Sequence, residues 1–197
     1  MTNQHVFELI NAGPGLAGLK LSVAVGLASW MVCLVPLLLG WAWWRGDTTS
    51  RRELLQMLLA VLLALAAGGI VAAIWPQPRP HALHLGRQYL SHADDASLPS
   101  QHVVLFWSLG LAALASRRHA LLGFPMLAAG LVVGWCRVYL GVQFPLDVLA
   151  AFALALLGVF AARALRPAVL GASARLIGAY DRLEKAARTR PRARHRD

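Results

Sequence analysis

The sequence predicts an all-α integral membrane protein, a bundle of five to six transmembrane helices. Of its 197 residues, 58% are hydrophobic and only 14% are charged. The mean hydropathy of +0.56 is too apolar for a soluble domain of this size. Several apolar runs are also long enough to cross the roughly 30 Å of hydrocarbon in a bilayer. A lipid environment therefore explains the composition better than water does.

Five apolar runs approach the roughly 20 residues that a transmembrane helix needs. They cover residues 19–44, 53–75, 102–116, 119–137 and 144–165. The third run is short. It becomes long enough if its helix begins near Pro99, with Ser97 or Ser100 capping the first turn, and ends at Arg117.

The N-terminal residues 4–12 predict a short amphipathic helix in the membrane interface, with an apolar face toward lipid. That face consists of Val6, Phe7, Leu9 and Ile10. The first residues lack the basic region and short apolar stretch of a cleavable signal peptide. We therefore expect the first membrane helix to direct insertion.

Basic residues collect in alternate connecting segments, which is the distribution that the positive-inside rule requires of cytoplasmic loops. With five spans, one side of the membrane holds Arg45, Arg51, Arg52, Arg117, Arg118, Arg163 and Arg166. The opposite, outer side holds the N-terminus, a long loop over residues 76–101 and a short segment over 137–143. The few arginines on this outer side are therefore candidates for a specific role.

The domain organisation predicted is one transmembrane domain, residues 1–170, followed by a basic cytoplasmic tail, residues 171–197. The net charge is +10, and seven of the 19 basic residues lie between Arg182 and Arg196. Such a tail is typical of a solvated end held near anionic headgroups. We therefore expect the membrane, and no nucleic acid, as its partner. The sequence does not indicate an oligomeric state.

The two cysteines, Cys33 and Cys136, both lie in apolar surroundings, and the sequence contains no CxxC pair or other metal-ligand spacing. We expect no disulfide, metal or cofactor.

Polar side chains gather in three stretches at the outer ends of the predicted helices: WPQPRP, SLPSQH and CRVYLGVQFPLDV. The candidate site residues in them are Arg79, Ser100, Gln101, His102, Arg137, Gln143 and Asp147. Ionisable groups at membrane depth are costly and usually functional, although a structural ion pair of Arg137 with Asp147 satisfies the same rule. His102 alone is more often a satisfied or helix-capping histidine. Together, two arginines and a helix start favour binding of a phosphate group.

These three stretches resemble the signature of the type 2 phosphatidic acid phosphatases, the PAP2 superfamily, which reads K-x6-RP, PSGH and SR-x5-H-x3-D. INAGP, HADDASLPSQH and RVYLGVQFPLDVLAA are similar to the BcrC-like branch of bacterial undecaprenyl-pyrophosphate phosphatases. The similarity covers roughly residues 5–165. It implies a PAP2-type helix bundle in the bacterial inner membrane with a periplasmic site. The implied activity is hydrolysis of undecaprenyl pyrophosphate, which recycles the carrier lipid of cell-wall synthesis and underlies bacitracin resistance.

The resemblance also implies roles for individual residues. His102 protonates the leaving oxygen, and Asp147 orients the residue at position 143. The phosphate is bound by Arg79 and Arg137, by a hydrogen bond from Ser100, and by the neighbouring Gln101. In the family a histidine at that position attacks phosphorus.

This chain has Gln143 at that position, and an amide lacks the basic lone pair that nucleophilic catalysis needs. Gln143 could still hydrogen-bond Asp147 or donate to phosphate. Milder departures from the signature are Ala72, Gln101 and Cys136.

The sequence leaves three interpretations open. The chain is a slow phosphatase, it is a silent member that binds a polyprenyl or glycerolipid phosphate as carrier, sensor or partner subunit, or glutamine was introduced at 143 to trap substrate. For a slow phosphatase, the alternative catalytic groups are His102 and the histidines of the outer loop, His81, His84 and His92. Loop histidines are otherwise expected to be solvated.

Overall fold

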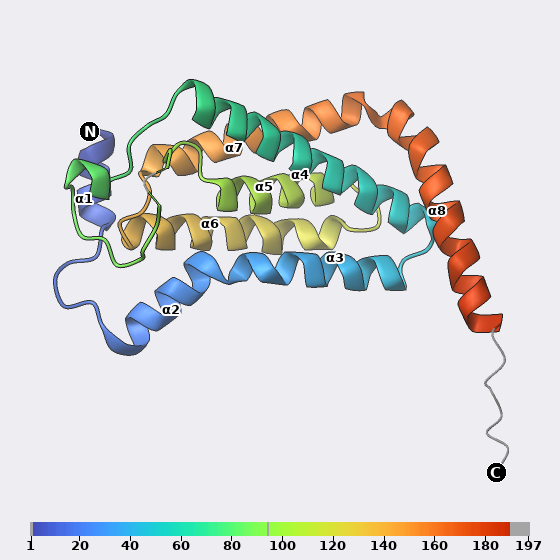
Figure 1. The fold of residues 1–197 in the computed structure, drawn as a ribbon, viewed down its shortest axis with the longest axis horizontal. Coiled ribbons are helices and arrows are strands. Elements are labelled where there is room, and N and C mark those ends of the chain that lie inside the picture. Colours follow the sequence, from blue (N-terminus) through green and yellow to red (C-terminus); the bar gives the residue numbers. More distant parts are fainter. Residues whose placement is uncertain (1, 94, 190–197) are drawn as a thin grey trace, which may run out of the picture.

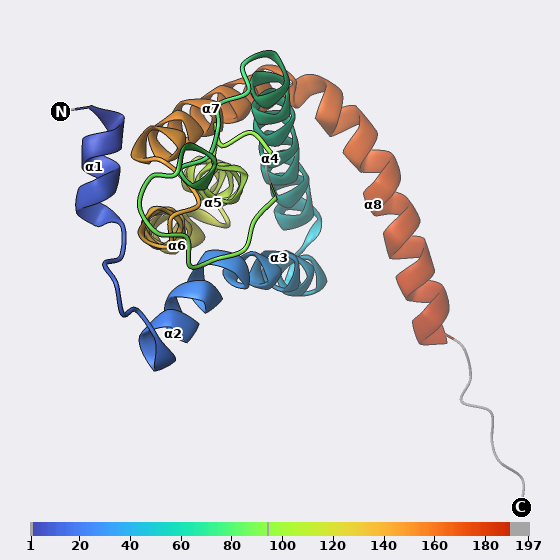
Figure 2. The ribbon, with the colours of Figure 1, turned by 60° about the vertical axis from the view of Figure 1, so that its left-hand side comes forward.

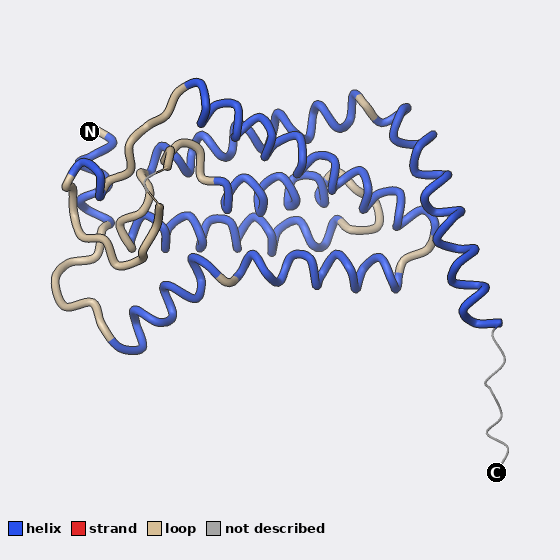
Figure 3. Tube along the Cα trace, in the orientation of Figure 1, coloured by secondary structure: helices blue, strands red, loops and turns tan. Residues whose placement is uncertain are grey.

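The computed structural model describes residues 2–93 and 95–189, and every regular element in these ranges is a helix (Figure 3). The elements are α1 (Asn3–Ile10), α2 (Gly18–Ser29), η1 (Met31–Cys33), α3 (Leu34–Arg45), α4 (Thr48–Ile74), η2 (His81–Leu83), α5 (Gln101–Leu114), η3 (Ala120–Leu122), α6 (Gly123–Tyr139), α7 (Pro145–Ala164) and α8 (Arg166–Thr189). The all-α fold class predicted from the sequence is confirmed.

Three helical segments are long and apolar enough to cross a membrane: Thr48–Ile74, Ala120–Tyr139 and Pro145–Ala164. A fourth is the pair Gly18–Ser29 and Met31–Arg45, which is bent by 42°. The first predicted span is thus broken rather than straight. Pro36, near the start of α3, explains the break, because it has no N–H for the carbonyl of Val32 and its ring crowds that carbonyl.

The helix α5 lies in the middle of the bundle, with α3, α4, α6 and α7 around it (Figure 2). Helices approach closely where glycine leaves room. A Cβ on Gly158 of α7 would lie 2.5 Å from the carbonyl oxygen of Ala60 in α4, and one on Gly130 of α6 would lie 2.5 Å from Trp107 in α5. The bundle is therefore packed through small residues, as is usual between membrane helices.

The central helix has 14 residues, or about 21 Å at 1.5 Å per residue, and is shorter than its neighbours α4, α6 and α7. Its first turn starts deeper in the bundle than the neighbouring ends of α6 and α7 (Figure 1). The connection between α4 and α5 folds over this recessed start. Residues at the beginning of α5 are consequently enclosed, although they belong to a helix end.

The N-terminal segment packs on the same end of the bundle. Phe7 of α1 is fully buried and meets Phe144 edge to face, with ring centroids 5.3 Å apart. The expectation that Phe7 faces lipid is therefore wrong, whereas Leu9 is exposed as expected. Asn11 donates to the carbonyl oxygens of Arg87 and Tyr139 at 2.9 and 3.1 Å. These bonds tie α1 to the outer loop and to the end of α6.

The basic tail contains a helix that its polar sequence did not predict. Helix α8 begins at Arg166 and runs without a break across the expected domain boundary at residue 170, while residues 190–197 lie outside the described ranges. Ile177 is buried. Tyr180 packs edge to face on Trp43 at 5.7 Å, and the guanidinium of Arg51 lies 4.5 Å from the Tyr180 ring. Cation–π and ring contacts therefore dock α8 on the bundle.

Gly141 forms the turn that carries the chain from α6 toward α7. Its φ is +80°, and a Cβ would lie 2.0 Å from the carbonyl oxygen of Arg87. Both the backbone conformation and the close approach require glycine. The turn therefore fixes the position of the outer loop relative to α6.

We expect Gly141→Ala to lower the free energy of unfolding by about 1–3 kcal/mol, because a side chain here is strained and displaces the Arg87 carbonyl. Thermal unfolding in detergent measures the change. Gly40→Ala is the matched control, since a Cβ at Gly40 meets nothing within 4 Å. An unchanged melting temperature in Gly141→Ala would contradict the account.

Candidate functional site

The first site residue, Arg79, lies in the connection after α4, where prolines at 76, 78 and 80 end the helix. Its side chain is buried. Nε donates to Asp95 Oδ1 at 2.8 Å, Nη1 to the carbonyl oxygen of Val142 at 2.7 Å, and Nη2 to that of Ala96 at 3.3 Å. The guanidinium thus links the outer loop to the segment between α6 and α7.

The second guanidinium, that of Arg137, belongs to the last turn of α6 and is 3% exposed. Nε donates to Gln143 Oε1 at 2.8 Å, Nη1 to the carbonyl oxygen of Ala28 at 3.3 Å, and Nη2 to His92 Nε2 at 3.0 Å. All three partners among the described residues are neutral. Within the described ranges, the charge of this buried arginine is therefore solvated by dipoles, with no carboxylate bonded to it.

Gln143 lies between Arg137 and the start of α5. Its side chain is 2% exposed, and its Oε1 accepts from both Ser100 Oγ at 2.6 Å and Arg137 Nε at 2.8 Å. Its Nε2 donates to the carbonyl oxygen of Ser97 at 3.4 Å. Both the oxygen and the nitrogen of the amide thus take part in hydrogen bonds within the site.

Asp147 does not bond to Gln143, contrary to the pairing expected from their spacing of four residues. Its Oδ2 accepts from Ser97 Oγ at 2.5 Å and from the backbone N–H of Phe144 at 2.7 Å. Its carbonyl oxygen accepts from the backbone N–H of Ser100 at 3.1 Å. The spacing fails as a guide because residue 143 precedes α7, which begins at Pro145. Asp147 caps α7 and anchors the segment before α5.

The two remaining predicted site residues occupy the first turn of α5, after the N-cap residue Ser100. His102 is half-buried and lies near enough to Arg137, His92 and Arg79 to interact with them electrostatically. Gln101 points elsewhere, because its side-chain amide lies against Gly68 of α4. The structure thus gathers every predicted site residue except Gln101.

The sequence offered His92 only as one of three alternative histidines of the outer loop, and sequence reasoning missed Asp95. Besides the bond to Arg137, His92 Nδ1 lies 3.5 Å from Asp95 Oδ1. Burial, followed by the charges of Arg79 and Arg137, lowers the pKa of His92. Burial opposes ionisation of Asp95, but the hydrogen bond and charge of Arg79 lower its pKa overall. The loop therefore contributes a neutral imidazole and a carboxylate to the cluster.

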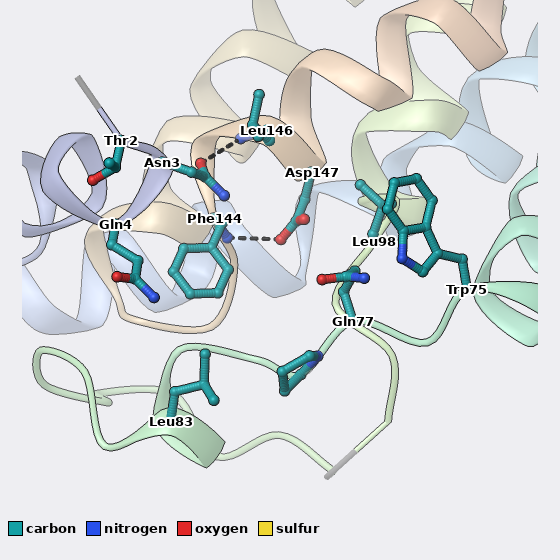
Figure 4. A pocket seen from close by; sticks show the side chains of 11 residues that line it. Thr2, Asn3, Gln4, Trp75, Gln77, Leu83, Leu98, Phe144, Leu146 and Asp147 are labelled. Carbon is teal, nitrogen blue, oxygen red and sulfur yellow. Dashed lines mark hydrogen bonds between the residues drawn. The ribbon is translucent and has the colours of Figure 1, made fainter.

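A pocket of about 350 Å³ adjoins the cluster at Asp147. Figure 4 shows Asp147 between Phe144 on one side and Leu98 and Trp75 on the other. The remaining lining residues come from α1, the loop after α4 and the start of α7 and are Thr2, Asn3, Gln4, Gln77, Pro78, Leu83 and Leu146. Polar groups thus lie next to apolar walls at the outer end of the bundle.

Among the described residues, no three His, Cys, Asp or Glu side chains are grouped closely enough to hold a metal ion. The chemistry that these residues offer consists of guanidinium and hydroxyl donors, two imidazoles and two carboxylates. This set suits an anion with several acceptor oxygens.

A family model described as the PAP2 superfamily matches residues 53–169. The chain is 32% identical over 161 residues to the putative undecaprenyl-diphosphatase YbjG of Escherichia coli K12, covering 82% of this chain and 81% of that protein. It is 26% identical over 155 residues to the undecaprenyl-diphosphatase BcrC of Bacillus subtilis, covering 79% of each. These matches confirm the family resemblance of the motif strings.

Two solved structures share the fold. LpxE of Aquifex aeolicus superposes with a TM-score of 0.64 at 20% identity, covering 80% of this chain and 92% of that one. The transmembrane PAP2-type phosphatidylglycerolphosphate phosphatase of Bacillus subtilis has a TM-score of 0.57 at 21% identity, covering 83% and 82%. The predicted PAP2-type bundle is thereby confirmed.

The lowered pKa of His92 predicts a loss of stability in acid. As the pH falls below about 6.5, the unfolded chain binds a proton at this residue before the folded chain does, so unfolding becomes more favourable. We expect His92→Gln to lose less melting temperature than the unmodified protein between pH 7.5 and pH 5. Equal losses in both proteins, measured by thermal unfolding in detergent, would contradict the buried neutral imidazole.

Proposed function

The chain belongs to the PAP2 superfamily, and we propose that it is a membrane phosphatase that removes the terminal phosphate from undecaprenyl diphosphate on the periplasmic face. The relatives named undecaprenyl-diphosphatase support this substrate. The positions of the basic residues support the orientation, because the loops on the far side from the cluster carry most of the arginines.

The observation that carries the proposal is the buried guanidinium of Arg137, whose hydrogen-bond partners in the described part of the chain are all neutral. A desolvated charge without an opposite charge bonded to it is costly, and an anion bound beside it offsets that cost. Arg79 lies near enough for its charge to act on Arg137. Two guanidinium groups suit the negative oxygens of a terminal phosphate, which an uncharged lipid lacks.

The pocket beside Asp147 supports a lipid substrate. Its apolar walls include Trp75, Leu83 and Leu146, and these three side chains are substantially exposed. An isoprenoid segment can pack between them while the diphosphate reaches the polar cluster. Apolar walls with a few polar groups at one end are typical of sites for amphipathic ligands.

The chemistry follows from the groups present. With Gln143 at the position of the attacking histidine, no imidazole can form a phosphoenzyme there, and the proposed reaction is direct attack by water on the terminal phosphorus. Arg79 and Arg137 stabilise the charge on the transferred phosphoryl group, Ser100 donates to its oxygen, and His102 protonates the departing lipid phosphate.

A second function is favoured by Gln143 itself. Its amide bonds to Ser100, Arg137 and the Ser97 carbonyl, so the cluster is complete without a nucleophile at 143. A protein with this cluster that binds a lipid phosphate and does not hydrolyse it would act as a carrier, sensor or partner subunit. Hydrolysis of the lipid diphosphate by the unmodified protein would support the phosphatase, and its absence would support the binding protein.

We expect the detergent-purified protein to release phosphate from undecaprenyl diphosphate slowly, and Arg137→Met to abolish release because the transition-state charge loses its donor. Arg163→Met, an exposed arginine on α7, is the matched control and should keep the full rate. Removing one such electrostatic contact typically costs about 10²–10³ in rate.

The Gln143→His variant, measured in the same assay, tests the second function. Release in Gln143→His together with silence in the unmodified chain would mean a lipid-phosphate binder. Release by the unmodified chain that persists in Arg137→Met would mean that this cluster is not the active site.

The proposed orientation predicts a labelling pattern in intact bacterial cells. In a background with Cys33→Ala and Cys136→Ala, a membrane-impermeant maleimide should modify His84→Cys in cells whose outer membrane is permeabilised. It should modify Arg117→Cys only after the inner membrane is broken. Both positions are exposed, so the reverse pattern would place the cluster on the cytoplasmic face.

A further inference from the structure

We propose that His92 is a catalytic residue, the general base that removes a proton from the water attacking the terminal phosphorus. This inference rests on the proposed phosphatase function and deepens it. It assigns to the outer loop the proton transfer that Gln143 cannot perform.

The position of His92 follows from its bond to the phosphate clamp. Its Nε2 lies 3.0 Å from Arg137 Nη2, and Arg137 also bonds to Gln143. The guanidinium of Arg137 therefore bridges the imidazole of His92 and residue 143, the position of the attacking histidine in the family signature. A phosphate oxygen held by Arg137 Nη2 comes within reach of this ring.

The protonation state of His92 follows from its partner. A guanidinium only donates hydrogen bonds, so the Nε2 atom facing Arg137 must accept and carries a lone pair, and the proton of the neutral ring is on Nδ1. The lowered pKa of His92 agrees with this neutral state. The basic nitrogen is thus the one directed at the clamp.

Asp95 completes the arrangement. Its Oδ1 lies 3.5 Å from His92 Nδ1 and accepts from Arg79 Nε at 2.8 Å. The Nδ1 atom is buried and has no hydrogen-bond partner among the residues that the structure describes. As Nε2 gains a proton, the ring becomes an imidazolium, and the carboxylate stabilises its charge.

In the proposed step, the terminal phosphate binds to the two arginines before water attacks. A phosphate oxygen takes over the hydrogen bond of Arg137 Nη2 and so frees the single lone pair of His92 Nε2. The water oxygen then forms a bond to the terminal phosphorus while a water proton passes to His92 Nε2. The bond between that phosphorus and the bridging oxygen breaks, and the bridging oxygen receives a proton from His102. The products are inorganic phosphate and the lipid monophosphate, after which His92 returns its proton to solvent and His102 regains one.

The neighbouring loop histidine His84 offers a contrast. It is exposed, its backbone is left-handed with φ +54°, and no described hydrogen bond links it to Arg79 or Arg137. An asparagine tolerates this backbone conformation. His84→Asn is therefore a matched control on the same loop.

The test uses phosphate release from undecaprenyl diphosphate by the full-length protein in detergent. In His92→Gln the amide oxygen can still accept from Arg137 but has no basic lone pair. We expect kcat to fall by about 10²–10⁴, the usual contribution of a general base, with KM changed by less than about threefold. The acidic limb of the pH profile should disappear, and His84→Asn should behave as the unmodified protein.

A second variant distinguishes lost chemistry from lost structure. Adding Gln143→His to His92→Gln supplies a new nucleophile and should restore release by at least about tenfold, since removal of a base leaves the phosphate clamp intact. Failure of this rescue would mean that His92 holds the cluster together and would overturn the proposal.

The remaining outcomes separate this inference from the proposed function. Release by the unmodified chain with more than a third of the rate left in His92→Gln overturns the role of His92 and leaves the phosphatase standing. Silence in the unmodified chain overturns both. A trapped phosphoenzyme on His92 would replace the general base by a nucleophile and also overturn the step proposed here.

Discussion

The burial of two guanidinium groups at one end of an apolar bundle is the constraint on which the outer half of this structure depends. Arg79 and Arg137 are 4% and 3% exposed. Every donor left without an acceptor at this depth would cost the full desolvation energy of the group. The carbonyl oxygens that answer this need come from Ala28, Ala96 and Val142, which belong to three separate segments. Satisfying the two arginines therefore draws α2, the outer loop and the connection before α7 together.

Hydropathy and motif spacing predicted the parts of the fold that depend on average composition. They placed α4, α6 and α7 to within a few residues, because a bilayer of fixed thickness selects apolar runs of matching length. They missed the bend at Trp30, because the mean hydropathy of an apolar run does not show that Pro36 lacks a backbone N–H. They also missed α8, which is stabilised by the contacts of Tyr180 with Trp43 and Arg51 and has no apolar run to detect.

The candidate site was predictable where residues sit at helix ends. Topology alone brings the ends of α4 and α6 and the beginnings of α5 and α7 to one face, so Arg79, Arg137 and His102 meet. The sequence offered three loop histidines but did not tell which of them joins the site, because a loop has no periodicity that tells which side chains turn inward. His92 and Asp95 lie three residues apart directly before the second motif, and this proximity in sequence was the available signal. The side chain of Gln101 lies against Gly68 of α4 instead, because the backbone position of a residue does not determine the direction of its side chain.

The side chains of Asp147 and residue 143 form hydrogen bonds to different atoms, and this independence has an evolutionary consequence. Its carboxylate holds Ser97 and the N-terminus of α7, so the scaffold does not rely on residue 143 to orient Asp147. The codons for histidine and glutamine differ in a single base. A lineage can therefore cross between the two residues in one mutational step, in either direction, without first rebuilding the helix ends that surround them. Position 143 can therefore gain or lose a histidine while the gene continues to encode a folded membrane protein.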